Sequence, residues 1–261
     1  MNFELWRYRG YIWNNAIMDL RNRYAGSSFG VLWNVLQPLF QILIFTFVFS
    51  QIMVARIPGL ESTSAFAIYL CAGLIPWGIF SETVIRGSNS FLENASFLKK
   101  LPVPEYVFIC QSVVASTIVL FVSVSILLIV VTFLGGAVSV TWLLLPLMLL
   151  LFQAFAFGLA LLFGCINVFF RDIGQILGTA MQIWMWMTPI VYFKDILPEG
   201  FQQAVDINPV YWYISSLHEI IVYSKVPDLQ LWTSMVICSL VSIILGALVL
   251  RALRAEIRDV I

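Results

Sequence analysis

Six long apolar stretches alternate with short polar segments along this chain of 261 residues. An α-helix rises about 1.5 Å per residue, so about 20 apolar residues cross a hydrocarbon core about 30 Å thick. The stretches are continuously apolar rather than alternating, which favours helices over the strands of a β-barrel. The pattern predicts an all-α integral membrane protein with six transmembrane helices, at residues 32–54, 66–87, 106–134, 142–169, 175–193 and 230–250.

The segment before the first span, residues 1–31, mixes aromatic and basic side chains. Trp6, Tyr8, Tyr11 and Trp13 recur beside Arg7 and Arg9 at near-helical spacing. Such a segment lies in the headgroup plane rather than across the bilayer, so we expect an N-terminal interfacial amphipathic helix. The alternative is a disordered tail. Because these residues lack a clean apolar core, we expect no cleaved signal peptide.

Residues 194–229, between the fifth and sixth spans, are too polar to cross the membrane and too apolar to stay in water. Pro198 can begin one short helix, and Asn208 and Pro209 can begin another as its N-cap and first residue. In that second helix the residues that fall on one face are Tyr211, Ile214, Leu217, His218 and Ile221. We therefore expect a re-entrant or interfacial helical hairpin.

Hydrophobic residues make up 61% of the chain and charged residues 11%, which fits a single membrane domain and no soluble domain. Basic residues concentrate in cytoplasmic loops. With six spans and a cytoplasmic N-terminus, eleven of the 14 Lys and Arg residues lie inside, and only Arg56, Lys194 and Lys225 lie outside. Both termini are then cytoplasmic. The formal net charge of zero gives no reason to expect nucleic acid as a partner.

The residues that carry chemistry in other membrane proteins are scarce in this one. The single histidine, His218, is expected to act as a polar anchor at the headgroup level, and the four cysteines lie in spans without the spacing of metal ligands. No G-x-x-x-x-G-K-[ST] motif occurs, so ATP-driven work would need another subunit. Glu82 and Arg86 have i,i+4 spacing and are expected to pair, although Glu82 is also the one candidate for a coupling-ion site.

Aromatic residues make up 15% of the chain and form dense groups on the first, second and fifth spans. Aromatic faces along a passage would suit sugar rings, which present apolar C–H surfaces. For each single ring, a lipid belt or ordinary helix packing is the alternative. The rings that we expect along such a path are Trp33, Phe40, Trp77, Trp184 and Trp186.

Short motifs recur in a fixed order along almost the whole chain. They are DLRNRY with GS and GVLW (residues 19–33), GLIPW (73–77), NASFLKK (94–100), NVFFRDI (167–173), WMWMTPIVY (184–192), Asn208-Pro209 and the final RDVI (258–261). This series resembles the membrane subunits of ABC-2-type polysaccharide exporters, the family that moves O-antigen, capsule or wall teichoic acid.

The resemblance implies one ABC-2-type transmembrane domain over residues 1–261, paired with an identical copy and with two cytoplasmic ABC ATPase subunits. ATP and Mg would bind in those ATPases, and this chain would hold no cofactor or metal and would not be an enzyme. The loop 88–101 would carry a coupling helix that contacts the ATPase through Phe91, Asn94, Phe97, Leu98, Lys99 and Lys100. The residues support this role, because Phe97 and Leu98 could fill a groove whose acidic rims pair with the lysines. The alternative is a solvated basic face on anionic lipid. Secondary contacts are expected from Arg21, Arg23, Arg171 and Asp172.

The family's periplasmic gate corresponds to the hairpin 194–229, with Pro198, Asn208, Pro209, Tyr211 and His218, and its conduit lies where the two copies meet. The resemblance thus implies a multi-pass permease in the bacterial inner membrane that exports a lipid-linked polysaccharide, with O-antigen the first choice and capsule the next. The alternatives are an ABC-2 exporter of a lipid or drug, or a polytopic enzyme acting on polyprenyl-linked sugars.

Overall fold

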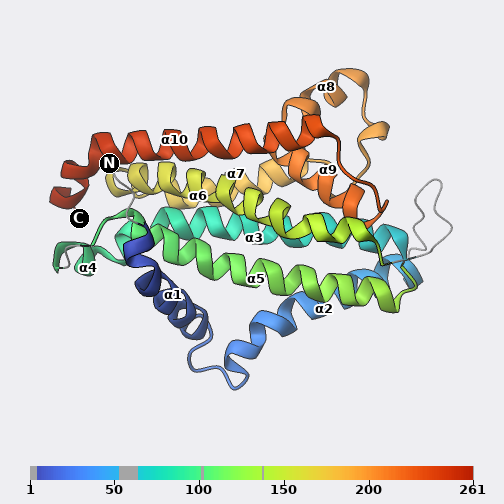
Figure 1. Ribbon diagram of the computed structural model, residues 1–261, viewed down its shortest axis with the longest axis horizontal. Coiled ribbons are helices and arrows are strands. Elements are labelled where there is room, and N and C mark those ends of the chain that lie inside the picture. The colour runs from blue at the N-terminus through green and yellow to red at the C-terminus, as the bar shows by residue number, and fades with distance from the viewer. Residues whose placement is uncertain (1–4, 53–63, 101–102, 137, 261) are drawn as a thin grey trace.

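The computed structural model describes residues 5–52, 64–100, 103–136 and 138–260, and within these ranges the regular structure is entirely helical (Figure 1). The α-helices are α1 (Leu5–Asn22), α2 (Trp33–Phe47), α3 (Ala65–Glu93), α4 (Ala95–Lys100), α5 (Tyr106–Phe133), α6 (Leu145–Phe169), α7 (Ile173–Met187), α8 (Glu199–Ile207), α9 (Pro209–Ile221) and α10 (Leu229–Val260). Shorter turns are η1 (Gly30–Leu32), the π-helical η2 (Val48–Ile52), η3 (Val140–Leu144) and η4 (Lys194–Ile196).

Parts of three expected segments lie outside the described residues. These are residues 1–4 of the N-terminal helix, residues 53–63 at the end of the first span and in the loop after it, and residue 101 of the coupling loop. Arg56, one of the three basic residues expected outside, is among them.

Five helical stretches are long and apolar enough to cross a membrane: Gly30–Ser50, Ala65–Glu93, Tyr106–Phe133, Val140–Phe169 and Leu229–Val260. The fifth of the six expected spans is not among them. It corresponds to α7, whose 15 residues make about 22 Å at about 1.5 Å per residue, less than a hydrocarbon core of about 30 Å. The chain ends this helix at Met187 because Thr188 adopts an extended conformation immediately before Pro189.

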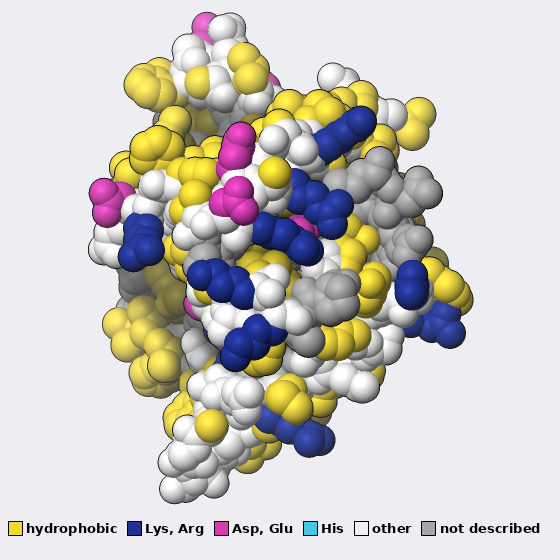
Figure 2. Space-filling view, turned by 90° about the vertical axis from the view of Figure 1, so that its left-hand side faces the viewer, with side chains coloured by type: hydrophobic (Ala, Val, Ile, Leu, Met, Phe, Trp, Pro, Cys, Tyr) yellow, Lys and Arg dark blue, Asp and Glu magenta, His cyan; other side chains and the backbone are white. Residues whose placement is uncertain are grey.

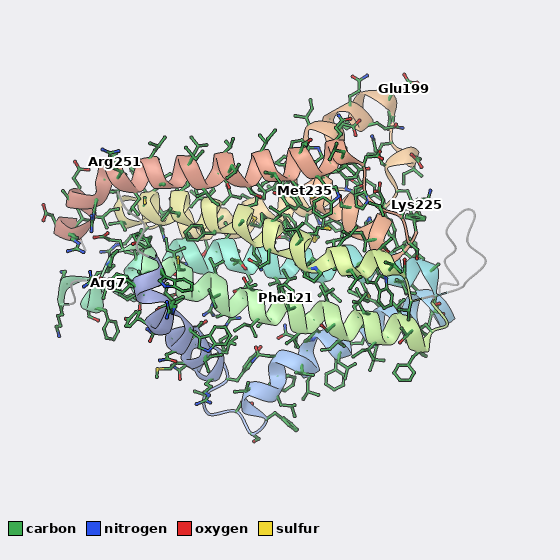
Figure 3. All side chains as sticks on the ribbon, in the orientation of Figure 1. Arg7, Phe121, Glu199, Lys225, Met235 and Arg251 are labelled. Atoms are coloured by element: carbon green, nitrogen blue, oxygen red, sulfur yellow. The ribbon has the colours of Figure 1, made fainter. Side chains whose placement is uncertain are left out.

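The long helices lie side by side, and the bundle has two unlike ends (Figure 1). Both chain termini and α4 lie at one end, which we call the basic end. The helices α8 and α9 lie near the other, which we call the hairpin end. Arg7 and Arg251 mark the basic end in Figure 3, and Glu199 and Lys225 mark the hairpin end. Helix α1 runs obliquely to the bundle, as an interfacial helix would.

The core is centred on α3 and α6. In its most apolar stretch α3 is 67% buried, whereas the first apolar stretch, which contains α2, is only 11% buried and exposes Phe40, Ile44 and Phe47. Helix α10 likewise presents a long row of exposed aliphatic side chains. Surfaces this apolar would aggregate in water, so they face lipid or another protein chain.

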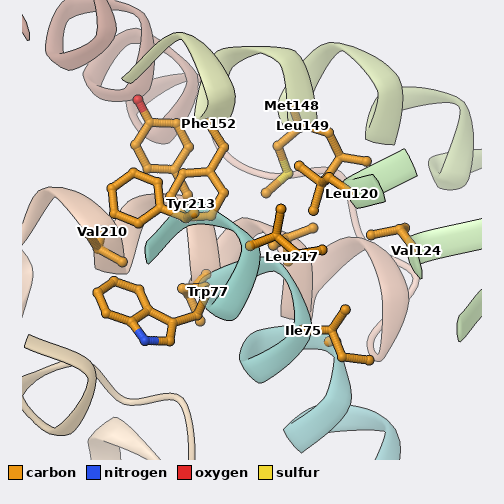
Figure 4. Packing of buried hydrophobic residues seen from close by; sticks show 14 of the residues in the cluster. Ile75, Trp77, Leu120, Val124, Met148, Leu149, Phe152, Val210, Tyr213 and Leu217 are labelled. Carbon is orange, nitrogen blue, oxygen red and sulfur yellow. The ribbon is translucent and has the colours of Figure 1, made fainter. Parts of the chain in front are cut away.

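Aromatic ring contacts join four helices within this core, and Figure 4 shows two of the rings, Phe152 and Tyr213. The rings of Phe80 in α3 and Phe152 in α6 stack with centroids 4.4 Å apart, and Phe152 stacks in turn on Tyr213 of α9 at 4.8 Å. Trp184 of α7 presents its edge to Phe155 of α6 at 6.4 Å. Aromatic pairs of this kind add about 0.5–1.5 kcal/mol each beyond the area they bury. The stack therefore fixes α9 and α7 to the bundle.

Helices α6 and α10 make their closest approach at two glycines. A Cβ at Gly158 would collide with the backbone of Ser242 and Ile243, and a Cβ at Gly246 would lie 2.8 Å from the carbonyl oxygen of Gly158. Small residues let two helix backbones approach closely, which is how helices associate in lipid. The same approach lets the Ser239 hydroxyl donate to the Leu151 carbonyl oxygen at 2.9 Å.

We expect Gly158→Ala to lower the free energy of unfolding of the detergent-solubilised protein by about 1–3 kcal/mol, and its melting temperature with it. The new methyl group would meet backbone that cannot move aside. Gly178→Ala is the matched control. Gly178 lies within α7 with open space around the position of a Cβ, so its replacement should leave stability unchanged or raise it slightly. Equal melting temperatures for the two variants would contradict the close approach of α6 and α10.

Candidate functional site

The basic end of the bundle presents a dense group of cationic side chains (Figure 2). They come from α1, from α4 and from the last turns of α10, and exposed members include Arg7, Arg9, Lys99, Lys100, Arg251, Arg254 and Arg258. Arg254 and Arg258 hold the Glu105 carboxylate, which is 1% exposed, between them: Arg254 Nε lies 3.0 Å from one oxygen, and Arg258 Nε donates to the other. This pairing fixes the end of α10 to the start of α5.

Helix α4 has one face towards the core and one towards the surface. Phe97 is 52% exposed, whereas Leu98 is only 3% exposed and joins a cluster with Phe91, Ile12 and Ile257. The expectation that Phe97 and Leu98 together fill a groove in a partner is therefore wrong for Leu98, because successive helical residues point in different directions. Phe91 is fully buried and belongs to α3, which continues to Glu93 before the chain turns into α4.

Four of the six residues predicted for the coupling contact are therefore available at the surface. Asn94 is half-buried and its side chain donates to the Ser90 carbonyl oxygen at 2.8 Å, which ends α3. Phe97, Lys99 and Lys100 are exposed on α4. Phe97 and Lys100 are three positions apart, so they lie on the same side of the helix.

A network of four charged side chains joins α1 to α3. Arg23, just past the end of α1, donates to Glu82 at 2.7 Å, to Asp19 at 3.2 Å and to the Ser116 hydroxyl of α5 at 3.2 Å. Arg86 donates to the Asp19 carboxylate at 2.7 and 2.9 Å, and its Nε lies 3.8 Å from Glu82. The expected pairing of Glu82 with Arg86 is thus one edge of a larger, electrically neutral network.

This network changes the interpretation of the secondary contacts. Arg23 has a side chain only 8% exposed and fully engaged within the chain, so its expected contact with a partner is wrong, whereas Arg21 is exposed. Arg171 and Asp172, in the short turn between α6 and α7, are also exposed. No local pattern in the sequence indicates that Arg23 pairs with Glu82, because the two residues are 59 positions apart.

At the hairpin end, the helices begin where the sequence indicates. Pro198 precedes α8, and the Asn208 side chain accepts a hydrogen bond from Val210 N at 3.1 Å with Pro209 as the first residue of α9. The Asn208 amide also accepts from Trp184 Nε1 at 2.9 Å and donates to the Thr188 hydroxyl at 2.8 Å. One side chain thus caps α9 and holds the end of α7.

Helix α9 packs inside the bundle. Tyr213 is fully buried, and its hydroxyl donates to the Met235 carbonyl oxygen of α10 at 2.8 Å and lies 2.7 Å from the Ser239 hydroxyl. The predicted inner face of α9 is confirmed for Ile214 and Leu217, whereas Tyr211 is half-buried. Helix α8, by contrast, projects away from the bundle.

His218 is buried rather than anchored at a headgroup surface, which corrects the expectation from the sequence. Its ring stacks on Tyr69 of α3 at 3.7 Å, and Nε2 lies 3.0 Å from the Tyr69 carbonyl oxygen. The contact depends on Gly73, where a Cβ would lie 3.0 Å from the same nitrogen. Burial lowers the pKa of His218 to about 3, because a charged imidazole would lose its hydration there.

The five aromatic residues expected along a substrate path differ in exposure. Phe40 and Trp186 are 49% and 58% exposed, and Trp33 is half-buried with its Nε1 donating to the Ser27 hydroxyl at 2.9 Å. Trp77, at 4% exposed, packs against the half-buried Trp184 at 6.1 Å. Within a single copy, Trp77 is therefore a core residue rather than a lining residue.

The described ranges contain no group of three or more His, Cys, Asp or Glu side chains that could hold a metal ion. Cys71 and Cys165 are buried and Cys110 and Cys238 half-buried, all as free thiols. The basic end thus combines the exposed Phe97 ring, exposed cationic side chains and the ion pairs that Arg254 and Arg258 make with the buried Glu105.

Comparison with known proteins agrees with this description. The model of the ABC-2 type transporter family matches residues 12–222. The chain belongs to the ABC-2 type transporter family. This ABC-2 protein is 28% identical over 216 residues, 81% of each chain, to the O-antigen export system permease protein RfbA of Klebsiella pneumoniae. It is also 28% identical over 231 residues to the protein of that name from Myxococcus xanthus, covering 87% of this chain and 86% of the other.

A further relative is the polysialic acid transport protein KpsM of Escherichia coli, 23% identical over 203 residues and 74% of each chain. The resemblance read from the sequence motifs is thus confirmed at the level of the family. A bacterial membrane transporter with several membrane-crossing helices agrees with both the relatives and the fold.

We expect Arg23→Gln to destabilise this ABC-2 protein by about 1–3 kcal/mol, because Asp19 and Glu82 lose their shared cation while Arg86 remains. Arg21→Gln, two positions earlier, is the matched control and should change stability by less than about 0.5 kcal/mol, since Arg21 is exposed. Melting temperatures in one detergent test the pair, and an equal loss in both would contradict the network.

We also expect stability to fall as the pH drops below about 6.5. The unfolded chain then binds a proton at His218 that the folded chain, with its pKa lowered to about 3, does not bind. Between pH 7.5 and pH 5 this difference removes about 1–2 kcal/mol of stability. His218→Asn lacks the titrating group and should show a smaller decrease of the melting temperature over the same range. Parallel pH profiles for the two proteins would contradict a neutral, buried His218.

Proposed function

We propose that this protein is the membrane-spanning permease subunit of an ATP-driven exporter that moves a lipid-linked polysaccharide out of the cytoplasm. Membership of the ABC-2 family carries the proposal, together with relatives named for O-antigen export and polysialic acid transport. O-antigen is the first choice of substrate and capsule polysaccharide the next. Two copies of the chain and two ABC ATPase subunits form the exporter, and ATP and Mg bind in the ATPases.

In this proposal the basic end faces the cytoplasm of a bacterium whose inner membrane holds the protein. The concentration of Lys and Arg at that end, where both termini lie, supports this orientation. Helix α7 and the turn residues 188–193 after it supply the sixth crossing. Helix α1 lies in the headgroup plane, and α8 and α9 form a re-entrant hairpin that gates the outer end.

The coupling contact is made by α4. The Phe97 ring enters a groove of the ATPase, and Lys99 and Lys100 pair with its acidic edges. Since Leu98 is packed among residues of α1, α5 and α10, movement of α4 moves the whole basic end rather than one loop. Arg171 and Asp172 make a second, smaller contact.

The conduit lies between the two copies. The poorly buried α2 and the exposed ring of Trp186 on α7 supply the apolar and aromatic surface that would face it. Closure of the ATPases on ATP shifts the pair between two arrangements, and the chain itself performs no covalent chemistry. Aromatic surfaces provide weak, reversible contacts that let successive sugar units pass.

Deleting the gene tests the function directly. We expect lipid-linked glycan to accumulate inside the cell and to disappear from the surface, and the wild-type gene to restore export. Phe97→Asp should restore less than a tenth of it while leaving the amount of folded protein unchanged, because a carboxylate replaces an exposed ring and repels acidic edges. Expressed as a free energy, a tenfold reduction corresponds to about 1.4 kcal/mol.

The matched control is Phe133→Asp, which alters an exposed ring on the last residue of α5, away from α4. It should export normally. Unchanged surface glycan after deletion would contradict the function, whereas normal export with Phe97→Asp would contradict only the coupling contact.

A further inference from the structure

A cavity of about 300 Å³ opens at the hairpin end, within a single copy of the chain. Its walls come from three segments: the start of α3, the residues that follow α7, and α9 with the residues after it. It lies at the opposite end of the bundle from α4. Ligand sites in proteins measure about 300–1,000 Å³, so this cavity suits one small unit rather than a chain of several.

Aromatic rings form one wall of the cavity, and they are held in place. Tyr69 and Phe193 lie with ring centroids 4.7 Å apart, and the Tyr69 hydroxyl donates to the Tyr192 carbonyl oxygen at 3.3 Å. The His218 ring also stacks on Tyr69, which is 5% exposed, so Tyr69 holds Phe193 in place from within the core. A ring held in this way offers an apolar surface to a ligand at little cost in side-chain entropy.

Polar groups form the facing wall of the cavity. Among the charged side chains of this wall that make no ion pair within the described residues, carboxylates outnumber ammonium groups. Lys194 is held by Asp206 outside the cavity. Two carboxylates, Asp195 and Glu219, then face one ammonium group, Lys225. Carboxylates accept hydrogen bonds from hydroxyl groups and repel a carboxylate on a ligand.

The backbone beside the cavity is strained. Ser224 has a φ of 52°, in the left-handed region that residues with side chains rarely adopt. The turn it makes lets Lys225 N donate to the Glu219 carbonyl oxygen at 2.8 Å, and it brings Tyr223 and Lys225 to the same cavity. Strain of about 1–3 kcal/mol is typical of ligand clamps and other functional sites.

An aromatic surface opposite carboxylates and hydroxyl groups is suited to a pyranose ring, which has apolar C–H faces and a rim of hydroxyls. We propose that this cavity binds one neutral pyranose unit of the exported glycan, with the half-buried Phe193 ring beside its face and Glu219 accepting hydrogen bonds from its hydroxyls. The proposal rests on the function proposed above, and adds that the site discriminates against acidic sugar units.

The ionisation of the polar wall supports this assignment. Burial raises the pKa of Glu219, with Asp228 nearby adding to the effect and Lys225 opposing it. Burial also raises the pKa of Tyr223. Both groups are therefore partly dehydrated, and such groups gain hydrogen bonds when a hydroxyl-bearing ligand enters.

Binding can be measured on the full chain in lipid nanodiscs, without an ATPase, by saturation-transfer difference NMR. The probes are methyl α-glucopyranoside and methyl α-glucuronide, which share a ring and differ by a carboxylate. We expect the glucoside to bind with a millimolar Kd. The Kd of the glucuronide should be higher by a factor of about five or more. Glu219→Gln and Tyr223→Ala should each weaken glucoside binding about fivefold or more.

Glu199→Gln is the matched control, since it neutralises an exposed carboxylate on α8 outside the cavity, and it should bind the glucoside as the wild type does. Melting temperatures check that the variants fold. The proposal is overturned if the glucoside gives no difference signal at tens of millimolar, if the glucuronide binds as tightly, or if Glu219→Gln and Tyr223→Ala leave binding unchanged. Because these measurements need no export, they fail or succeed independently of the deletion experiment.

Discussion

Neutralisation of buried charge is the constraint that organises the basic half of this molecule. In an apolar bundle an unpaired charge costs several kcal/mol, so each buried ion needs partners supplied by the fold. Arg23 meets that need with two carboxylates, and Glu105 meets it with two guanidinium groups. The first arrangement fixes α1 to α3 and the second fixes α10 to α5. The helices around the cation-rich surface are thereby locked in register with the core.

The hairpin end depends on aromatic packing rather than on charge. Tyr213 stacks on Phe152 and reaches α10 through its hydroxyl, while His218 stacks on Tyr69. Helix α9 therefore touches α3, α6 and α10 at once. In the proposed exporter, a displacement that begins at α4 reaches the outer end through α3, because α3 carries ion-paired residues towards one end and Tyr69 at the other. This continuity gives the proposed coupling a physical route.

Local signals in the sequence predicted much of this structure, and tertiary features escaped prediction. Asn208 and Pro209 start α9 as predicted because capping depends on a few adjacent residues. The burial of Leu98 beside the exposed Phe97 depends on the position of helices distant in the chain, and so does the pairing of Arg23 with Glu82. For α7, apolar composition predicted a full span, but composition does not reveal where the helix ends before Pro189. The family motifs were recognised from the sequence, whereas the assignment of partner contacts needed the orientation of each side chain.

The contact between Gly158 and Gly246 has a mechanical consequence. Two backbones that touch with no side chain between them leave nothing to rearrange, so α6 and α10 can be displaced only as one rigid body. Freedom to slide or tilt must then reside in elements with looser attachment, namely α2 with its mostly uncovered surface and α8 beyond the bundle. A transport cycle built on this fold would widen or narrow a passage by moving α2 and α8, while α6 and α10 keep their relative position.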